Sequence, residues 1–247
     1  MYNNIIFDLY GTLIDIKTDE ERAEFWDSLA AAFNRLGAPY EPPLLRERYL
    51  TLVAEALAGN TKTQYPDTRV YGVLDKLLKE KGVISDHTTL YQLCRQFRRL
   101  STIYITLYPG IRDMLAVLTA AGKRLFILSN GQREFSEGEL QDLGIYSFFK
   151  GLYFSADYEI SKPDPGFFRI LLDREGLQCS DCIMIGNDHT TDIAGAAAVG
   201  MDSLYIHSNH SHPIMAEQVP ATYRVVAPGN VGQAVFQVLG LVSFTSL

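Results

Sequence analysis

The sequence has few cysteines, no long apolar run and no excess of positive charge. Only three of its 247 residues are cysteine, an odd and low number that argues against a disulfide-stabilised secreted fold. No apolar run reaches the roughly 18 residues that a membrane-spanning helix needs, so we expect no membrane association. The net charge of -7 is the opposite of what general nucleic-acid-binding proteins show, so we expect no nucleic-acid partner.

The rest of the composition is that of an ordinary globular protein. The length of 247 residues is enough for one large domain, or for one domain that carries an insertion. No basic segment followed by an apolar stretch precedes Asp8, so we predict no signal peptide and a cytoplasmic protein. The sequence does not set the oligomeric state, and we expect a monomer or a homodimer.

Two patterns alternate along the chain. Residues 1–15 and 105–247 alternate short hydrophobic strands with helices, which predicts an α/β fold with a Rossmann-like, doubly wound parallel sheet. Residues 16–104 show only helical periodicity. We therefore predict a core of residues 1–15 plus 105–247. An all-helical cap domain, residues 16–104, would be inserted after the first strand and lie over the carboxyl edge of the sheet.

Polar residues follow the expected strands at the points where the strands end. Ligands of open α/β sheets bind outside the carboxyl ends of the strands, so we expect these residues to meet at one edge. A carboxylate directly after a buried first strand is a candidate nucleophile. In chain order the residues are Asp8, Ser129, Lys162 and the pair Asp188 and Asp192.

These four segments resemble the four motifs of the haloacid dehalogenase-like hydrolase superfamily. They are DLYGTL at residues 8–13, LSNG at 128–131, KPDP at 162–165 and GNDHTTDI at 186–193. The helical block resembles the cap that many members carry after the first motif. On this resemblance, which extends over the whole core, the chain is identified as a member of the helical-cap subfamily.

The resemblance implies a hydrolase that acts through a covalent aspartyl intermediate on Asp8. Ser129 and nearby backbone amides would hold the oxygens of the transferring group, and Lys162 would neutralise charge. The small-molecule substrate would be a phosphate ester. The implied catalytic residues are Asp8, Tyr10, Ser129 and Lys162, and the implied substrate-binding residues are Thr12, Asn130 and Gly131.

The resemblance also implies a Mg²⁺ site, with Asp8, the Tyr10 carbonyl, Asp188 and Asp192 as ligands. The fourth motif usually has Asp directly after its glycine, where this chain has Asn187. If Asn187 takes the ligand position, the site has a neutral amide there. If Asp188 takes it, the common Asp-x-x-x-Asp spacing is restored, and we favour this alignment. One of the two aspartates could instead cap the following helix.

Tyr10 is the main departure from the phosphatase pattern, which has an Asp there that protonates the leaving group and then activates water. Loss of such a group typically costs about 10²–10⁴ in rate. The superfamily's 2-haloacid dehalogenases resemble this chain at Tyr10, need no metal, and bind halide with a cap arginine, for which Arg46 and Arg48 are candidates. The retained pair Asp188 and Asp192 favours Mg²⁺, because carboxylates clustered without a cation repel each other.

The leading hypothesis is therefore a Mg²⁺-dependent phosphatase of a small phosphorylated metabolite. The alternatives are a metal-independent 2-haloacid dehalogenase and a degenerate member that binds without turnover. Two charged clusters have simpler interpretations. We interpret His207, His210 and His212 as part of a polar loop, and we place the arginines of the last cap helix on its solvated face: Arg95, Arg98 and Arg99.

Overall fold

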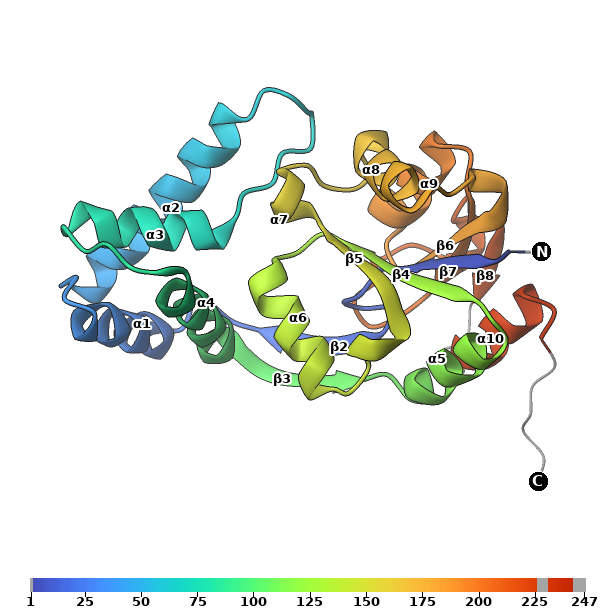
Figure 1. The fold of residues 1–247 in the computed structure, drawn as a ribbon, viewed down its shortest axis with the longest axis horizontal. Coiled ribbons are helices and arrows are strands. Elements are labelled where there is room, and N and C mark those ends of the chain that lie inside the picture. The colour runs from blue at the N-terminus through green and yellow to red at the C-terminus, as the bar shows by residue number, and fades with distance from the viewer. Residues whose placement is uncertain (1, 226–230, 242–247) are drawn as a thin grey trace.

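A computed structural model describes residues 2–225 and 231–241 (Figure 1), so the remaining residues of the expected core lie outside the described part. Six parallel strands form one sheet in the order β5–β4–β1–β6–β7–β8. This arrangement confirms the predicted Rossmann-like fold and puts the first strand at the centre. The strands are β1 (Asn4–Phe7), β4 (Arg124–Ser129), β5 (Phe149–Phe154), β6 (Cys182–Gly186), β7 (Asp202–Ile206) and β8 (Tyr223–Val225).

Helices cover both faces of this sheet (Figure 1). Along β1, Ile5 and Phe7 pack into one hydrophobic cluster with α5 (Ile111–Ala120) and α10 (Val231–Val238). Ile6, between them, belongs to the cluster on the opposite face. That second cluster includes side chains of α8 (Pro165–Glu175) and α9 (Ala194–Ala198), and the short helix α7 (Ser155–Tyr158) follows β5. Burial on both faces explains why the core strands are almost continuously apolar.

The segment between β1 and the rest of the core contains four helices with a hydrophobic core of their own. Aromatic rings dominate it: the ring centroid of Phe97 is 5.0 Å from that of Phe25 and 5.4 Å from that of Tyr49. Phe135, from helix α6 (Arg133–Asp142), stacks on Phe97 at 5.9 Å. We propose that these helices form a cap domain within residues 16–104. They are α1 (Ala23–Arg35), α2 (Pro42–Gly59), α3 (Val70–Glu80) and α4 (His87–Ser101).

Two strands at the base of this helical block were not predicted from the sequence. Strands β2 (Ile14–Thr18) and β3 (Thr102–Leu107) form an antiparallel ribbon that carries both chain connections between the helices and the core. The two strands pair with each other across more than 80 residues of sequence. A local periodicity analysis cannot detect such a pair, so the expectation of an all-helical insertion was incomplete.

A second connection joins the helical block to the core through residues 60–69, between α2 and α3. The Ser161 amide donates to the Tyr65 carbonyl at 2.9 Å, and the Gln132 side chain donates to the Thr68 carbonyl at 2.9 Å. Arg69 pairs with the buried carboxylate of Glu134 on α6. The block is therefore held against the core by the β2–β3 ribbon, by residues 60–69 and by the packing of α4 on α6.

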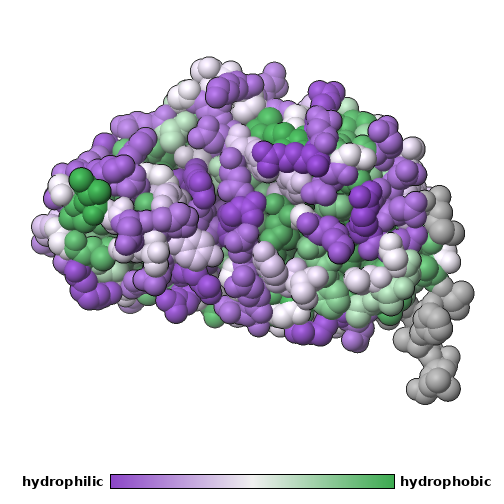
Figure 2. Space-filling view, in the orientation of Figure 1, coloured by the Kyte–Doolittle hydropathy of each residue, from purple (hydrophilic) through white to green (hydrophobic). Residues whose placement is uncertain are grey.

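Hydrophilic side chains predominate on the face in Figure 2, over the helical block and the core alike, with smaller hydrophobic patches between them. Among the described residues, no helix is both long enough and apolar enough to cross a bilayer.

Phe97 tests how far the helical block depends on its aromatic core. Phe97→Ala should lower the free energy of unfolding by about 3–5 kcal/mol, because it removes a ring buried among three others. Urea denaturation followed by circular dichroism measures this loss. Ile84→Ala is the control: this side chain is 89% exposed, so its removal should change stability by no more than about 0.5 kcal/mol. Equal losses in the two variants would contradict this account.

Candidate active site

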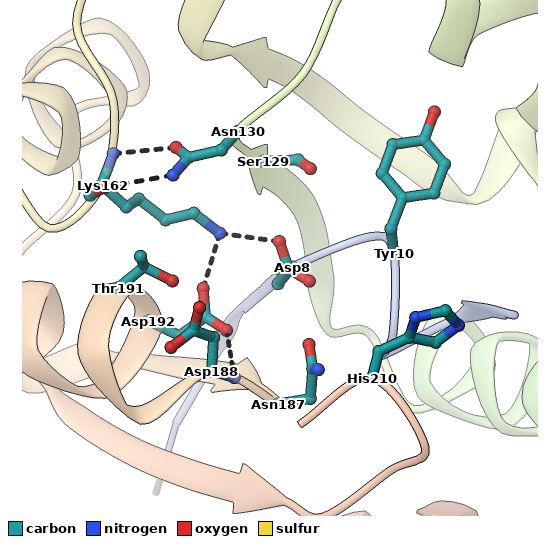
Figure 3. Close-up of a pocket in the computed structure, with 10 residues that line it drawn as sticks. All are labelled: Asp8, Tyr10, Ser129, Asn130, Lys162, Asn187, Asp188, Thr191, Asp192 and His210. Carbon is teal, nitrogen blue, oxygen red and sulfur yellow. Dashed lines mark hydrogen bonds and ion pairs between the residues drawn. The ribbon is translucent and has the colours of Figure 1, made fainter. Parts of the chain in front are cut away.

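A cavity of about 200 Å³ opens at the carboxyl ends of the central strands (Figure 3). It brings together most of the residues that the motifs indicated, although they come from distant parts of the chain. Thr12 and Gly131, both predicted to bind substrate, do not line it. The lining residues are Asp8, Tyr10, Ser129, Asn130, Lys162, Asn187, Asp188, Thr191, Asp192 and His210.

A buried ion network holds the centre of the cavity. The Lys162 ammonium is 2.7 Å from Asp8 Oδ1 and 2.6 Å from Asp192 Oδ1, and all three side chains are almost fully buried. Although burial favours the neutral amine, the charges of the two carboxylates raise the pKa of Lys162. Burial and the charge of Asp8 raise the pKa of Asp192, against the opposing effect of Lys162. Lys162 therefore stays charged between its two partners.

The turn after β1 positions Asp8 against the fourth motif. Gly11 adopts a left-handed backbone with φ of 85°, and a Cβ atom there would lie 2.5 Å from the Asn187 amide nitrogen. Only glycine fits this turn, for both reasons. The Thr12 hydroxyl lies 3.1 Å from Asp8 Oδ2 and 3.2 Å from Asn187 Oδ1, so it links the nucleophile candidate to Asn187. Thr12 thus orients Asp8 from behind the cavity.

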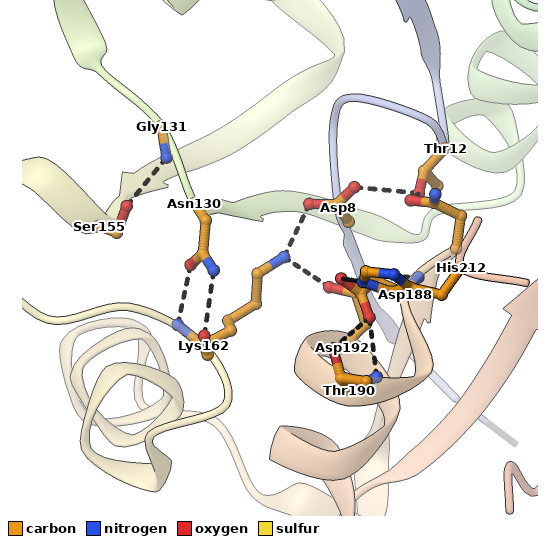
Figure 4. A network of polar contacts seen from close by, with 11 residues as sticks. Asp8, Thr12, Asn130, Gly131, Ser155, Lys162, Asp188, Thr190, Asp192 and His212 are labelled. Carbon is orange, nitrogen blue, oxygen red and sulfur yellow. Dashed lines mark hydrogen bonds and ion pairs between the residues drawn. The ribbon is translucent and has the colours of Figure 1, made fainter. Parts of the chain in front are cut away.

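In the second motif, Asn130 and Gly131 were expected to bind substrate, but their polar groups form hydrogen bonds within the protein (Figure 4). The Asn130 side chain accepts from the Lys162 amide at 2.8 Å and donates to the Lys162 carbonyl at 3.0 Å. The Gly131 amide donates to Ser155 Oγ at 2.9 Å, and Ser155 in turn donates to Asp67 of the helical block. Buried Ser129 lines the cavity itself.

The fourth motif places its two aspartates differently. Asp192 Oδ2 accepts from the Asp188 amide at 3.0 Å, so both oxygens of Asp192 are engaged. Asp188 caps the following turn, His189–Ile193, by accepting from the Thr190 amide at 2.8 Å. Although burial opposes it, these Thr190 hydrogen bonds and the charge of His212 lower the pKa of Asp188. The helix-capping alternative therefore holds for Asp188, which also lines the cavity.

The hydroxyl and ring of Tyr10 contact α6 and α4, although Tyr10 also lines the cavity. Its hydroxyl donates to Glu139 and lies 2.9 Å from Ser136 Oγ. The Arg98 guanidinium lies 5.1 Å from the centre of the Tyr10 ring and also pairs with Glu139 at 2.6 Å. Burial and the charge of Glu139 raise the pKa of Tyr10, so this phenol is no base near neutral pH. In Figure 3 its hydroxyl points away from Asp8.

One prediction about basic side chains was wrong and another was incomplete, and each had a signal in the sequence. Arg98 is not on a solvated face, because its side chain is only 15% exposed. It lies four residues after buried Cys94, at the border of the apolar stripe, and that spacing was the available signal. His210 belongs to the cavity and not merely to a polar loop. The rule that carboxyl ends of parallel strands share one edge, applied to β7, would have indicated it.

The two arginines considered for halide binding lie elsewhere. Arg46 pairs with Glu21, and Arg48 pairs with Glu80 at 2.6 Å. Neither lines the cavity, and within the described part of the chain no other arginine does.

The cavity can hold a hard cation through oxygen atoms. Asp8, Asn187 and Asp188 all line it. Within residues 2–225 and 231–241, no group of three or more His, Cys, Asp or Glu side chains is gathered as a metal site. Mg²⁺ needs only one or two carboxylates, because it keeps several of its waters, whereas zinc sites are built from three or four protein ligands. The donor set therefore fits Mg²⁺.

An aspartate after the central strand, paired with a buried lysine under a helical block, defines a Rossmann-like hydrolase. The chain belongs to the haloacid dehalogenase-like (HAD) hydrolase family, whose model matches residues 2–200. It is 30% identical over 217 residues to the human N-acylneuraminate-9-phosphatase, covering 87% of each chain.

Two further comparisons come from proteins of known structure. The HAD-hydrolase YfnB of Bacillus subtilis is 26% identical over 228 residues, covering 91% of each chain. Its magnesium-bound crystal structure superimposes with a TM-score of 0.56 at 21% identity, covering 97% of this chain and 99% of YfnB. A 2-haloacid dehalogenase from Pseudomonas syringae superimposes with a TM-score of 0.65 at 22% identity, covering 96% of this chain and all of that one. At these identities the structures establish a shared fold.

The environment of Tyr10 leads to a prediction. Tyr10→Phe should keep kcat/KM within about threefold of the parent, because the hydroxyl is bound to Glu139 and is not directed at Asp8. It should lower stability by about 0.5–1.5 kcal/mol, the typical net contribution of one hydrogen bond. Steady-state kinetics and thermal melts measure the two effects. A loss of activity of a hundredfold or more in the folded variant would show that the hydroxyl takes part in the reaction.

Proposed function

We propose that this protein is a Mg²⁺-dependent phosphatase of a small phosphorylated metabolite, with Asp8 as its nucleophile. The observation that carries the proposal is the charge balance of the cavity. Three carboxylates line it, Asp8, Asp188 and Asp192, against one ammonium, that of Lys162. When all four are ionised, these groups sum to a charge of −2.

A net charge of −2 in the cavity would repel an anionic substrate that enters without a cation. Like charges a few ångströms apart repel strongly where water is scarce, and a phosphate ester adds further negative charge. A divalent cation held by the carboxylates would offset this net charge of −2. The phosphatase among the sequence relatives and the magnesium-bound structure of YfnB support the same proposal.

The roles of the side chains follow from their positions. Asp8 Oδ2 is the more available of the two carboxylate oxygens, because Oδ1 is paired with the Lys162 ammonium, whereas Oδ2 accepts from the neutral Thr12 hydroxyl. That oxygen would attack phosphorus and form the aspartyl intermediate. Lys162 and Ser129 would stabilise charge on the phosphoryl oxygens. Asp192 keeps Lys162 in place, and Asn130 holds its backbone.

The metal would be held by Asp8, Asp188 and the carbonyl of Tyr10, with the Asn187 amide alongside. When bound, Mg²⁺ supplies positive charge that polarises the phosphoryl group. Each oxygen of Asp192 already accepts one hydrogen bond, so as a direct ligand Asp192 would share an oxygen between the metal and Lys162 or the Asp188 amide.

A 2-haloacid dehalogenase is the second candidate. Tyr10 favours it, since the superfamily's dehalogenases resemble this chain at that position of the first motif. Against it, Arg46 and Arg48 lie outside the cavity, and Asp188 is retained inside it.

One pair of assays separates the two candidates. The purified protein should hydrolyse 4-nitrophenyl phosphate with Mg²⁺ and lose that activity with excess EDTA, and it should release no chloride from 2-chloropropionate. Asp8→Asn should reduce turnover below about 1% of the parent, because an amide cannot form the covalent intermediate. Metal-independent chloride release would establish the dehalogenase instead.

The position of the metal can be tested without turnover. At 100 times its dissociation constant, Mg²⁺ should stabilise the parent protein by about 2.7 kcal/mol in thermal melts. Asp188→Asn should abolish this stabilisation while keeping the helix cap, because Asn caps helices as well as Asp does. Asn187→Ala is the matched comparison and should retain most of the stabilisation. The reverse result would assign the ligand position to Asn187.

A further inference from the structure

His210 and Asp15 form a hydrogen-bonded pair at the cavity. His210 Nε2 lies 2.8 Å from Asp15 Oδ1, and the His210 side chain, 34% exposed, lines the same cavity as Asp8. Asp15 belongs to β2, just after the first motif, and His210 follows β7. The pair therefore joins two segments that are distant in sequence, at the edge of the sheet where Asp8 lies.

Hydrogen bonds fix the position of the Asp15 carboxylate, which in turn orients the imidazole of His210. Its Oδ1 also accepts from the side-chain amide of Asn209 at 3.1 Å and from the Tyr104 hydroxyl at 3.1 Å. Although partial burial opposes it, the Asn209 and His210 hydrogen bonds lower the pKa of Asp15. An ionised carboxylate only accepts hydrogen bonds, so Nε2 carries a proton toward Asp15.

The other ring nitrogen of His210, Nδ1, is available to exchange a proton. Nδ1 of His210 has no hydrogen-bond partner in the described part of the chain. In Figure 3 the ring stands beside the segment that carries Asp8 and Tyr10. Imidazole gives and accepts protons near neutral pH, and a carboxylate that orients it through the opposite nitrogen is a recurring arrangement in hydrolases.

Tyr10, at the position of the usual acid, does not serve this task. A phosphate ester with an alkyl leaving group needs a proton donor, and the hydroxyl of Tyr10 is directed at Glu139. We propose that His210, oriented by Asp15, is the residue that protonates the leaving group and then activates water. This inference rests on the proposed phosphatase function and deepens it.

His210 would give up one proton in the first step of the reaction and regain one in the second. In the first step, Asp8 Oδ2 bonds to phosphorus while the bond from phosphorus to the ester oxygen breaks. The ester oxygen keeps the electron pair of that bond, takes the proton from Nδ1 of charged His210 and leaves as an alcohol. Neutral His210 then accepts a proton from water as the water oxygen bonds to phosphorus. The bond from phosphorus to Asp8 breaks, the carboxylate is restored, and inorganic phosphate leaves.

Titratable and charged groups from several elements surround His210. Asp15 on β2 faces it directly, with Tyr104 on β3 behind it. Tyr108 donates to Asn209 of the same loop. The ionisable groups that share the cavity with it are Asp8, Tyr10, Lys162, Asp188 and Asp192.

Leaving-group dependence tests the proposal. The substrates are 4-nitrophenyl phosphate, which departs without a proton, and benzyl phosphate, which needs one. His210→Gln should lower kcat/KM for benzyl phosphate by about 10²-fold or more, and for 4-nitrophenyl phosphate by less than about 10-fold. Asp15→Asn should show the same selectivity to a smaller degree. Loss of the base should also give a burst of 4-nitrophenol equal to the enzyme concentration, as the aspartyl intermediate accumulates.

His207→Gln is the matched control, because His207 lies in the same loop but bonds Tyr205 at 3.0 Å and does not line the cavity. It should keep the parent's ratio for the two substrates. Thermal melts establish that each variant is folded. An unchanged ratio in His210→Gln, whether both rates fall together or neither falls, overturns the assignment of His210 alone. Absence of Mg²⁺-dependent turnover in the parent protein overturns the proposed function, and this assignment with it.

Discussion

The site depends on one buried ammonium group placed between two carboxylates. Lys162 is held by Asp8 and Asp192 from two different strand ends, and both side-chain groups of Asn130 fix its backbone. Removal of one member would leave an uncompensated charge in a buried place, which is far more costly than removal of an exposed pair. This interaction therefore fixes the first, third and fourth motifs relative to one another.

The helical block reaches this site through polar contacts. Arg98 of α4 lies over Tyr10 and pairs with Glu139, and Asp67 is linked through Ser155 to the Gly131 amide. The helical block thus contacts the first motif through Arg98 and reaches the second motif through Ser155. A change in the position of the block would alter the surroundings of Tyr10 directly and those of Gly131 through Ser155.

The role of Tyr10 shows how a single substitution changes the meaning of a motif. At the sequence level, a tyrosine in place of an acid removes a proton donor and makes the chemistry uncertain. In the folded chain the phenol is a structural bridge between the first motif and α6. The group that can replace the lost acid comes from the loop after β7, which carries none of the four motifs.

The sequence by itself determined the order of strands and helices in the core, the position of the inserted helices and the residues at the strand ends. These features arise from local periodicity and from the rule that parallel strands end at one edge, so neighbouring residues are enough to reveal them. Only the tertiary structure decided the β2–β3 ribbon, the capping role of Asp188, the burial of Arg98 and the pairing of His210 with Asp15. Each of these last features except the cap joins residues more than 40 positions apart, and the cap itself required the local geometry of the turn. Contacts of this kind depend on packing in three dimensions, which a one-dimensional pattern does not contain.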